Sequence, residues 1–405
     1  MLSKNSMFMS IINVRVLAIL FFISTLCTTL LGQGNLFITS NNEQSIAQPQ
    51  QFAFRDSLLN SRVFKTSMFV QVGDLFTLQS QGSIAFSIPG RTGNFSAIAE
   101  FVENQDSTNY SWAGSLDSAY PGYLVYIKDT IGVIGFIQLE DSHYFILPVD
   151  AQHSWLMETD IEFNLHCGND TIKQVPPETC PPLTSACPAV IDVLLLAAPS
   201  AQNYFANFGR VINGTWVSAL PLYVRLAELM MNWPVWRSGV GNKLYRYRYL
   251  DYDIQDFETN FKAFGNNISN DILSLIDNLD AQSIRDAARA DLVTLLTDES
   301  EYGSIYGIAG TLETDDRRSF SIVQLKYTFG RNTTGHELTH LHGGRHSRKD
   351  QGGNDDSPVC HHGWRFVDDD NNTQYTVMAN IDLGEQRILN FSNPDIEFNG
   401  APTGT

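Results

Sequence analysis

The chain has 405 residues, of which 43% are hydrophobic and 17% are charged, so it can build the packed cores of two or three domains. Its formal net charge is −18 and its pI is about 4.8. The sequence contains no run of Lys and Arg residues that would form a basic patch. The composition therefore argues against a nucleic-acid-binding protein and against attraction to anionic lipid, and we expect no nucleic-acid partner.

The first 33 residues have the features of an export signal. Lys4 and Arg15 precede an uncharged apolar run, 16–31, and small Gly32 follows it. This run is shorter than the roughly 20 apolar residues that span a bilayer. We expect a signal peptide over 1–33, a secreted, extracellular or cell-surface product, and no stable membrane association after cleavage. An uncleaved membrane anchor is the alternative.

The region after the signal peptide divides into two parts that differ in composition and pattern. Residues 35–60 are polar and rich in Gln, Asn and Ser, which predicts a loose leader. From about 66 to 166, short strand-like runs alternate with turn signals such as Pro89-Gly90, which favours a β-rich sandwich or a barrel-like domain. The predicted strands are 67–72, 75–79, 83–88, 97–102, 123–127, 133–139 and 143–147.

A Pro-rich stretch, 175–183, predicts an extended linker. The continuous apolar run Val190–Leu196 then predicts a strand buried on both faces. Strands mixed with helices indicate an α/β domain that continues to the end of the chain. Further strands are predicted at 243–250, 291–296 and 320–325, and helices at 217–232 and 284–290.

The segment 336–346 carries the pattern of a catalytic zinc site. His336 and His340 are four residues apart, so a helix places both imidazoles on one face. Asn332, Thr333 and Thr334 offer N-terminal caps for that helix. Gly343 can take the left-handed conformation that ends it, and the reversal brings back His346 as a third ligand. Three protein ligands leave one position open, as catalytic zinc sites do.

Glu337 follows the first histidine and is not needed as a ligand. Its carboxylate can take a proton from water that zinc acidifies, and the resulting hydroxide would attack a peptide carbonyl. The protonated carboxyl would then pass the proton to the leaving amine. His342 lies on another face of the helix, so we interpret it as a packing residue and not as a ligand.

These residues, HELTHLHGGRH, fit the metzincin pattern HExxHxxGxxH of zinc metalloproteases. Thr376-Val377-Met378-Ala379-Asn380 resembles the Met-turn of that clan, in which the methionine packs beneath the metal ligands. Segments such as Tyr306-Gly307-Ile308-Ala309 resemble the reprolysin-like, adamalysin-type peptidases, especially bacterial-type members. The likeness covers about 190–405.

The resemblance implies an α/β (α+β) metzincin catalytic domain, with a mixed twisted sheet and an active-site helix, preceded by a β-rich pro-domain. It implies a pro-domain over 34–167, a linker with the activation region over 168–189, and a catalytic domain over 190–405. The family's last helix would begin where Thr405 stands, so the sequence resembles a C-terminally truncated member. Asn380 replaces a tyrosine that many relatives use, so we expect no tyrosine metal ligand.

Cys167 has two open interpretations. His166-Cys167-Gly168 resembles the cysteine switch of metzincin zymogens, in which a pro-domain thiolate takes the open zinc position. A disulfide of Cys167 is the alternative, because the export signal makes disulfides possible. If Cys167 is reduced, the simplest pair is Cys180–Cys187, which leaves Cys360 unexplained.

The resulting expectation is a secreted zinc endopeptidase, made as a zymogen, that acts on proteins or peptides and carries one catalytic Zn²⁺. The alternative is a non-catalytic zinc-binding or interaction protein that keeps the metzincin fold. Calcium could bind the oxygen ligands of Asp355-Asp356 or 368–372, but these residues match no recognised loop pattern, which favours a solvated acidic loop.

Overall fold

A computed structural model of the chain defines the fold. The structure describes residues 35–61, 63–73, 82–106, 108–118, 122–159, 166–167, 189–241, 243–249, 267–298, 302–310, 318–328, 332–348, 362–380 and 387–404. The predicted signal peptide 1–33 and nearly all of the predicted linker, 168–188, lie outside these residues. Among the described residues, no helix is both long enough and apolar enough to cross a membrane.

The expected loose leader is wrong, because residues 43–60 are mainly helical. Helix α2 covers Glu43–Ile46, and α3 covers Pro49–Asn60. A capping box between Gln48 and Gln51 begins α3, and Pro49 fits its first turn. Its buried Phe54 and Leu58 join the main core. The polar composition hid this helix, because few apolar residues mark its buried face.

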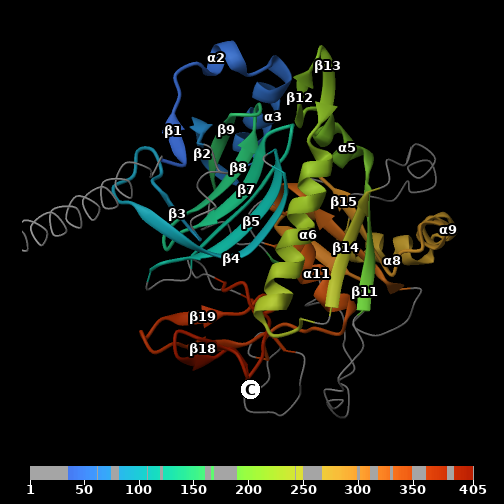
Figure 1. Ribbon diagram of the computed structural model, residues 1–405. Coiled ribbons are helices and arrows are strands. Elements are labelled where there is room, and N and C mark those ends of the chain that lie inside the picture. Colours follow the sequence, from blue (N-terminus) through green and yellow to red (C-terminus); the bar gives the residue numbers. More distant parts are fainter. Residues whose placement is uncertain are drawn as a thin grey trace, which may run out of the picture.

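Nine antiparallel strands form one curled sheet, in the order β1-β2-β9-β8-β7-β6-β5-β4-β3 (Figure 1). The expectation was a sandwich or a barrel-like domain, and the structure has one curled sheet in place of the two sheets of a sandwich. It confirms that the region is β-rich. The strands are β1 (Phe37–Thr39), β2 (Phe64–Val72), β3 (Ser83–Phe86), β4 (Phe95–Asp106), β5 (Asn109–Leu116), β6 (Tyr123–Lys128), β7 (Val133–Gln138), β8 (His143–Pro148) and β9 (His153–Thr159).

Six of the seven predicted strands in this region coincide with β2, β3, β4, β6, β7 and β8, whereas 75–79 lies outside the described residues. The sequence reading missed β5 and β9. Both strands carry polar residues on faces that are buried in the fold, such as Ser111 and Ser154. Alternation of apolar and polar residues is therefore a weak guide to strands that are covered on both faces.

A second sheet has six strands in the order β10-β16-β17-β15-β11-β14. Strand β16 runs antiparallel to β17, and the other pairs are parallel, so the predicted mixed α/β architecture is confirmed. The strands are β10 (His166–Cys167), β11 (Ala189–Ala197), β14 (Lys243–Tyr249), β15 (Leu292–Thr297), β16 (Ile305–Ala309) and β17 (Phe320–Gln324).

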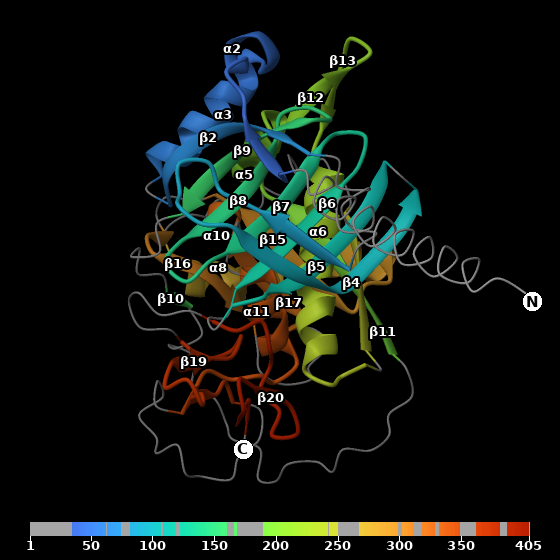
Figure 2. The ribbon, with the colours of Figure 1, turned by 60° about the vertical axis from the view of Figure 1, so that its left-hand side comes forward.

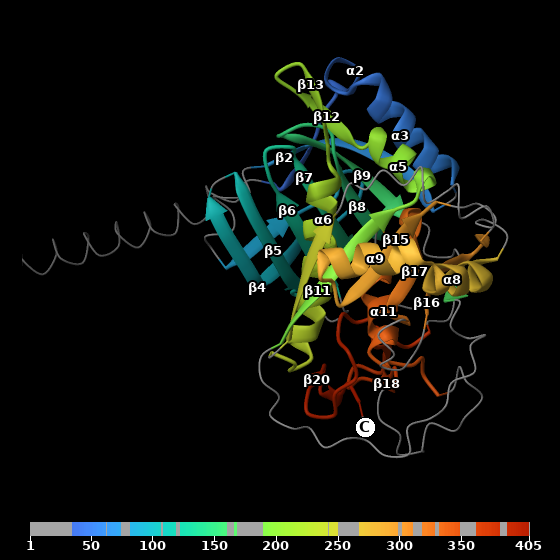
Figure 3. The same cartoon turned by 90° about the vertical axis from the view of Figure 1, so that its right-hand side faces the viewer.

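Helices cover both faces of this second sheet. Along β11, Val193 and Leu195 face the core that contains α6, whereas Leu194 and Leu196 face the core beneath α8 and α9. Figure 3 shows α8 and α9 lying across the strands on the side toward the viewer. The helices are α5 (Pro199–Ala206), α6 (Leu220–Arg237), α8 (Ile268–Asp277), α9 (Leu279–Ala288), α10 (Leu325–Thr328) and α11 (Thr333–Leu341).

Strand β11 is only partly buried. Its second half is covered on both faces, but Val190 is 51% exposed. The expectation of burial on both faces along Val190–Leu196 is therefore wrong for the beginning of the strand. Helix α8 was not predicted, although its Ile272 and Leu275 lie fully inside the core.

The two sheets share one hydrophobic core around α6, which stands between them in Figure 1. Polar contacts also join the two halves. Arg237, at the end of α6, pairs with Glu100 of β4 at 2.7 Å. The hydroxyl of Tyr123, in β6, accepts a hydrogen bond of 3.0 Å from the backbone N–H of Leu389. The nine-stranded sheet is thus packed onto the mixed sheet and its helices.

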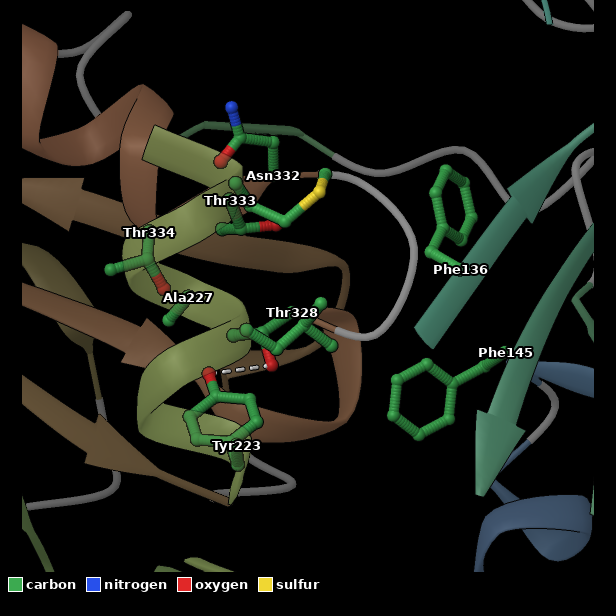
Figure 4. A pocket seen from close by; sticks show the side chains of 10 residues that line it. Phe136, Phe145, Tyr223, Ala227, Thr328, Asn332, Thr333 and Thr334 are labelled. Carbon is green, nitrogen blue, oxygen red and sulfur yellow. Dashed lines mark hydrogen bonds between the residues drawn. The ribbon is translucent and has the colours of Figure 1, made fainter. Parts of the chain in front are cut away.

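A small cavity remains between the two halves (Figure 4). The rings of Phe136 in β7 and Phe145 in β8 face it from one side, and Tyr223 and Ala227 of α6 face it from the other. The Tyr223 hydroxyl donates a 2.9 Å hydrogen bond to the side chain of Thr328. The first residues of α11 complete the lining. This cavity is separate from the group of histidines described below.

The C-terminal residues form small antiparallel hairpins below the sheets. Figure 2 shows them in red, with β19 and β20 beneath α11. The remaining strands are β12 (Gly209–Ile212), β13 (Thr215–Ser218), β18 (Arg365–Val367), β19 (Thr373–Tyr375), β20 (Glu397–Phe398) and β21 (Ala401–Pro402). The C-terminal region, which contains β18 to β21, supplies the backbone that lies against the histidines of α11.

Candidate metal centre

Helix α11 carries His336 and His340 on its buried face, as their spacing predicts. Both imidazoles have no exposed surface. The predicted side-chain capping of α11 is wrong. Asn332 is the N-cap residue, but it has a left-handed backbone with φ of 48° and its side chain makes no capping hydrogen bond. The position of α11 therefore depends on packing against the mixed sheet and α6.

The turn after α11 has the geometry that its glycines predict. Gly343 has φ of +85°, in the left-handed region that favours glycine. Gly344 approaches Thr339 so closely that a Cβ there would lie 2.9 Å from the Thr339 carbonyl oxygen. The chain reverses at these two residues and returns His346, fully buried, to the face of α11.

The three histidines converge through their Nε2 atoms. Nε2 of His346 lies 3.1 Å from Nε2 of His336 and 3.1 Å from Nε2 of His340. The opposite ring nitrogens face carbonyl oxygens. Nδ1 of His336 lies 2.9 Å from Val377 O, and Nδ1 of His340 lies 2.7 Å from Gly344 O. A carbonyl only accepts, so Nδ1 is the donor in both rings and Nε2 keeps its lone pair.

Burial sets the charge of these imidazoles. It lowers the pKa of His336 and of His340 well below the ordinary histidine value. The positive charge of Arg387 lowers the pKa of His336 further. Both rings are therefore neutral at neutral pH, which is the form that binds a metal ion.

Glu337 points its carboxylate at the same place. It has no exposed surface. A Cβ on Gly307, in the adjacent strand β16, would lie 2.6 Å from its Oε1. Gly307 is thus the residue that leaves room for the carboxylate beside the sheet edge. This is a steric reason for glycine, and the sequence reading had noted Gly307 only as part of a resemblance.

Met378 lies in a tight turn below the histidines. The turn closes with a 3.0 Å hydrogen bond from the backbone N–H of Ala379 to Thr376 O, and Met378 is 3% exposed. Val377, in the same turn, provides the carbonyl that holds His336. A Cβ on Gly363 would lie 2.3 Å from the carbonyl carbon of Met378. Gly363 therefore allows the backbone of the Met378 turn to pack directly against the backbone at residue 363.

Cys167 reaches the group from strand β10, which pairs in parallel with the edge strand β16. Its sulfur lies 3.5 Å from Nε2 of His340 and 3.4 Å from Oε1 of Glu337. Cys167 is reduced and buried, so the structure does not contain the alternative disulfide at this residue. Cys180, Cys187 and Cys360 lie outside the described residues.

The donor set fits zinc. Tetrahedral zinc, with bonds of about 2.0–2.1 Å to nitrogen and about 2.3 Å to sulfur, places two nitrogens about 3.3 Å apart and a nitrogen and sulfur about 3.6 Å apart. The two Nε2–Nε2 distances of 3.1 Å and the sulfur–Nε2 distance of 3.5 Å are close to this geometry, and all four donor atoms lie within 4.8 Å of one another. Cys167 and the three histidines are the one group of this kind in the described part of the chain.

Two further side chains border the group, and sequence reasoning missed both. The hydroxyl of Tyr306, in β16, lies 3.4 Å from Nε2 of His336. The charge of Arg387 acts on that hydroxyl, and its Nε donates to Ala379 O at 3.0 Å. Tyr306 belongs to the segment 306–309 that resembles reprolysin-like peptidases, and that resemblance was the available signal. Arg387 had no local sequence signal.

Other candidates lie apart from the group. The ring of His342 is exposed and packs edge-on against Tyr245 at 5.6 Å, in agreement with its interpretation as a non-ligand. Asp368 accepts hydrogen bonds from Asn372 N and from the side chain of Gln374, so it stabilises the β18–β19 turn. Asp355 and Asp356 lie outside the described residues.

Comparison with known proteins gives relatives of one kind. The sequence matches no protein-family model. It is similar to peptidyl-Asp metalloendopeptidase of Xanthomonas campestris pv. campestris, with 28% identity over 225 residues, or 55% of this chain and 48% of that protein. A Stenotrophomonas maltophilia protein of the same name is 28% identical over 225 residues, or 55% of this chain and 49% of that one. The chain spans about half the length of the curated relatives it matches.

Two solved structures are similar at a low level. A chain from a chaperone–substrate complex aligns with a TM-score of 0.38 and 17% identity, over 53% of this chain and 32% of that chain. Metalloproteinase-II from Bacteroides fragilis aligns with a TM-score of 0.29 and 13% identity, over 71% of this chain and 84% of that chain. At these scores, neither structure defines the fold. In sequence, then, about half of this chain is similar to metalloendopeptidases, and its fold brings three histidines and a cysteine together as a group able to hold a metal ion.

Proposed function

We propose that this protein is a zinc-dependent endopeptidase of the metzincin, reprolysin-like type. The observation that carries the proposal is the convergence of three buried Nε2 atoms beside the buried carboxylate of Glu337. The ligands would be His336, His340 and His346, with Met378 packed beneath them. The curated relatives, named as metalloendopeptidases, support the same activity.

The residues of the chain would divide the work of peptide hydrolysis. Zinc, when bound, supplies Lewis acidity for a peptide carbonyl and for water. Glu337 would take the proton of the attacking water and pass it to the leaving amine. The hydrogen bonds from Nδ1 of His336 and His340 to backbone carbonyls would fix both rings in the tautomer that directs Nε2 inward. Burial would exclude competing water.

We also propose that the chain is a secreted zymogen whose latch is Cys167. The thiol lies within 3.5 Å of His340 Nε2 and 3.4 Å of Glu337 Oε1, so it would occupy the fourth ligand position and separate the carboxylate from water. Strand β10 would also cover the edge of β16, where a substrate backbone could add to the sheet. Activation would require release of β10, for example after cleavage within 168–189.

The bond preference of the relatives extends the proposal to a substrate class. Their name, peptidyl-Asp metalloendopeptidase, leads us to propose that this chain cleaves peptides beside aspartate. A set of peptides that differ only in Asp, Asn, Glu or Ala at one position would test this preference. Equal values of kcat/KM across the set would contradict it while leaving the peptidase proposal intact.

The activity itself is tested with the full chain, as wild type and with Cys167→Ala. Cleavage of a denatured protein should disappear on addition of a zinc chelator, return with zinc, and be absent from Cys167→Ala/Glu337→Gln. The matched control is Glu103→Gln, which changes an exposed carboxylate on β4. If Cys167→Ala/Glu337→Gln cleaves as fast as Cys167→Ala with this control, Glu337 is not the general base and the proposed mechanism is wrong. If Cys167→Ala itself does not cleave with zinc bound, the alternative of a non-catalytic zinc-binding or interaction protein holds.

A further inference from the structure

We propose that the hydroxyl of Tyr306 is a catalytic hydrogen-bond donor, which stabilises the negative charge that develops on the substrate carbonyl oxygen. This inference rests on the proposed peptidase function and adds a residue to it. Asn380 follows the Met-turn, and we expected no tyrosine ligand at that position. A phenol reaches the site from another segment, because Tyr306 lies in β16.

The position of the hydroxyl supports this role. It lies 3.4 Å from Nε2 of His336, whereas the thiol of Cys167 lies near His340 and Glu337. The phenol therefore borders the open ligand position on the side of His336, whereas the carboxylate borders it on the side of His340. A substrate carbonyl bound there would have the general base on one side and a hydroxyl on another.

The contact with His336 defines where the phenolic proton points. Nδ1 of His336 donates to Val377 O, so Nε2 offers only a lone pair and the Tyr306 hydroxyl is the donor in this contact. The phenolic proton therefore points at Nε2. When a metal takes the lone pair of His336 Nε2, that nitrogen can no longer accept it. A substrate oxygen at the open position would be the next acceptor.

The phenol is also shielded from solvent. Tyr306 is 4% exposed, so its hydrogen bond to a developing negative charge would form in a water-poor site, where such bonds are strong.

A purely structural role makes a different prediction for Tyr306→Phe. The ring packs edge-on against His336, at 5.7 Å between centroids, and phenylalanine keeps that contact. Only the hydroxyl is lost. A matched control is Tyr327→Phe, which removes a buried hydroxyl that donates to Gly303 O at 3.0 Å and belongs to α10.

The test measures zinc and acetohydroxamate binding by calorimetry in the full chain with Cys167→Ala. Acetohydroxamate is a small anionic zinc chelator whose oxygens can accept the hydrogen bond of Tyr306. We expect Tyr306→Phe to bind zinc as tightly as its parent but acetohydroxamate at least about tenfold more weakly, because a hydrogen bond to a charged group is lost. Tyr327→Phe should match the parent, and kcat for a peptide should fall roughly 10²-fold in Tyr306→Phe alone.

Equal acetohydroxamate affinity in Tyr306→Phe and its zinc-bound parent would overturn the role of Tyr306 and leave the peptidase proposal standing. Failure of the parent itself to bind zinc would instead contradict the proposed function, and this inference with it. If Tyr306→Phe does not fold, Arg387→Gln provides the test. It keeps the phenol but removes the positive charge that acts on it, so it too must weaken acetohydroxamate binding without loss of zinc.

Discussion

The sulfur of Cys167 lies 3.5 Å from Nε2 of His340, although 173 positions separate the two residues in the chain. Strand β10 makes this contact possible, because it pairs with the edge of the sheet that α11 packs against. The thiol also lies within hydrogen-bonding distance of Glu337. The side chain of Cys167, in β10, thus contacts both a proposed ligand and the proposed base.

Cys167→Ala should therefore increase activity in the full chain. Loss of the thiol opens the fourth position, whereas the three histidines still bind zinc. We expect the initial rate of peptide cleavage, or of autolysis, to rise at least about tenfold at equal zinc content. Cys167→Ser, which keeps the shape but is a weaker zinc ligand, should lie between wild type and Cys167→Ala. Equal rates for all three chains at equal zinc content would exclude the latch.

Gly307→Ala should reduce catalysis without loss of metal. The new Cβ would lie 2.6 Å from Glu337 Oε1, and the carboxylate would have to move. A displacement of about 1 Å at a catalytic group can cost roughly 10²-fold in kcat. Zinc content should stay unchanged, because the three nearest atoms to the added Cβ all belong to Glu337, which is not a proposed ligand. The control is Gly241→Ala, whose added Cβ meets no atom within 4 Å. A kcat equal to that control would show that the position of Glu337 is not critical.

Gly363→Ala should destabilise the fold around the Met-turn. The added Cβ would lie 2.3 Å from the Ala379 nitrogen and from the Met378 carbonyl carbon, and backbone atoms cannot move aside as a side chain can. We expect a loss of about 2–3 kcal/mol in the free energy of unfolding, measured by denaturant titration, and weaker zinc binding. Gly241→Ala should change that free energy by less than about 0.5 kcal/mol. Equal stability of the two variants would contradict this reading of Gly363.

Glu100→Gln should loosen the contact between the two halves of the chain. Glu100 pairs with Arg237, whose guanidinium also stacks on Tyr123 of β6 and on Trp233. Because the pair is partly exposed, we expect an effect of about 1 kcal/mol. Hydrogen–deuterium exchange at residues 387–391, which contact the nine-stranded sheet, should become faster. Exchange there that matches Glu103→Gln would show that the ion pair does not hold the halves together.

The sequence predicted the proposed ligands well because their chemistry depends on short-range spacing. An i, i+4 pair on a helix and a glycine reversal are local features, so His336, His340 and His346 could be named before any fold was known. The central strands of the mixed sheet were equally accessible, because they are mostly apolar, as in Leu292–Thr297, whereas β10 and β16 were not predicted.

Contacts between distant segments could not be read in this way. Arg387 comes within electrostatic reach of Tyr306 only because β16 and the segment after the Met-turn lie together in the fold. The choice between a sandwich and a single curled sheet was also open, since alternating strands fit one sheet or two equally well. Helix α3 was missed because Gln51, on its buried face, donates hydrogen bonds to Val149 O and Gly209 O and does not extend an apolar stripe.

X-ray absorption at the zinc edge of the full chain tests the central claim most directly. The account predicts one bound zinc with three nitrogens at about 2.0–2.1 Å and one sulfur at about 2.3 Å. Cys167→Ala should keep the three nitrogens and replace the sulfur by an oxygen. A spectrum without the three nitrogens, or with a sulfur that persists in Cys167→Ala, would contradict a site built from His336, His340, His346 and the thiol of Cys167.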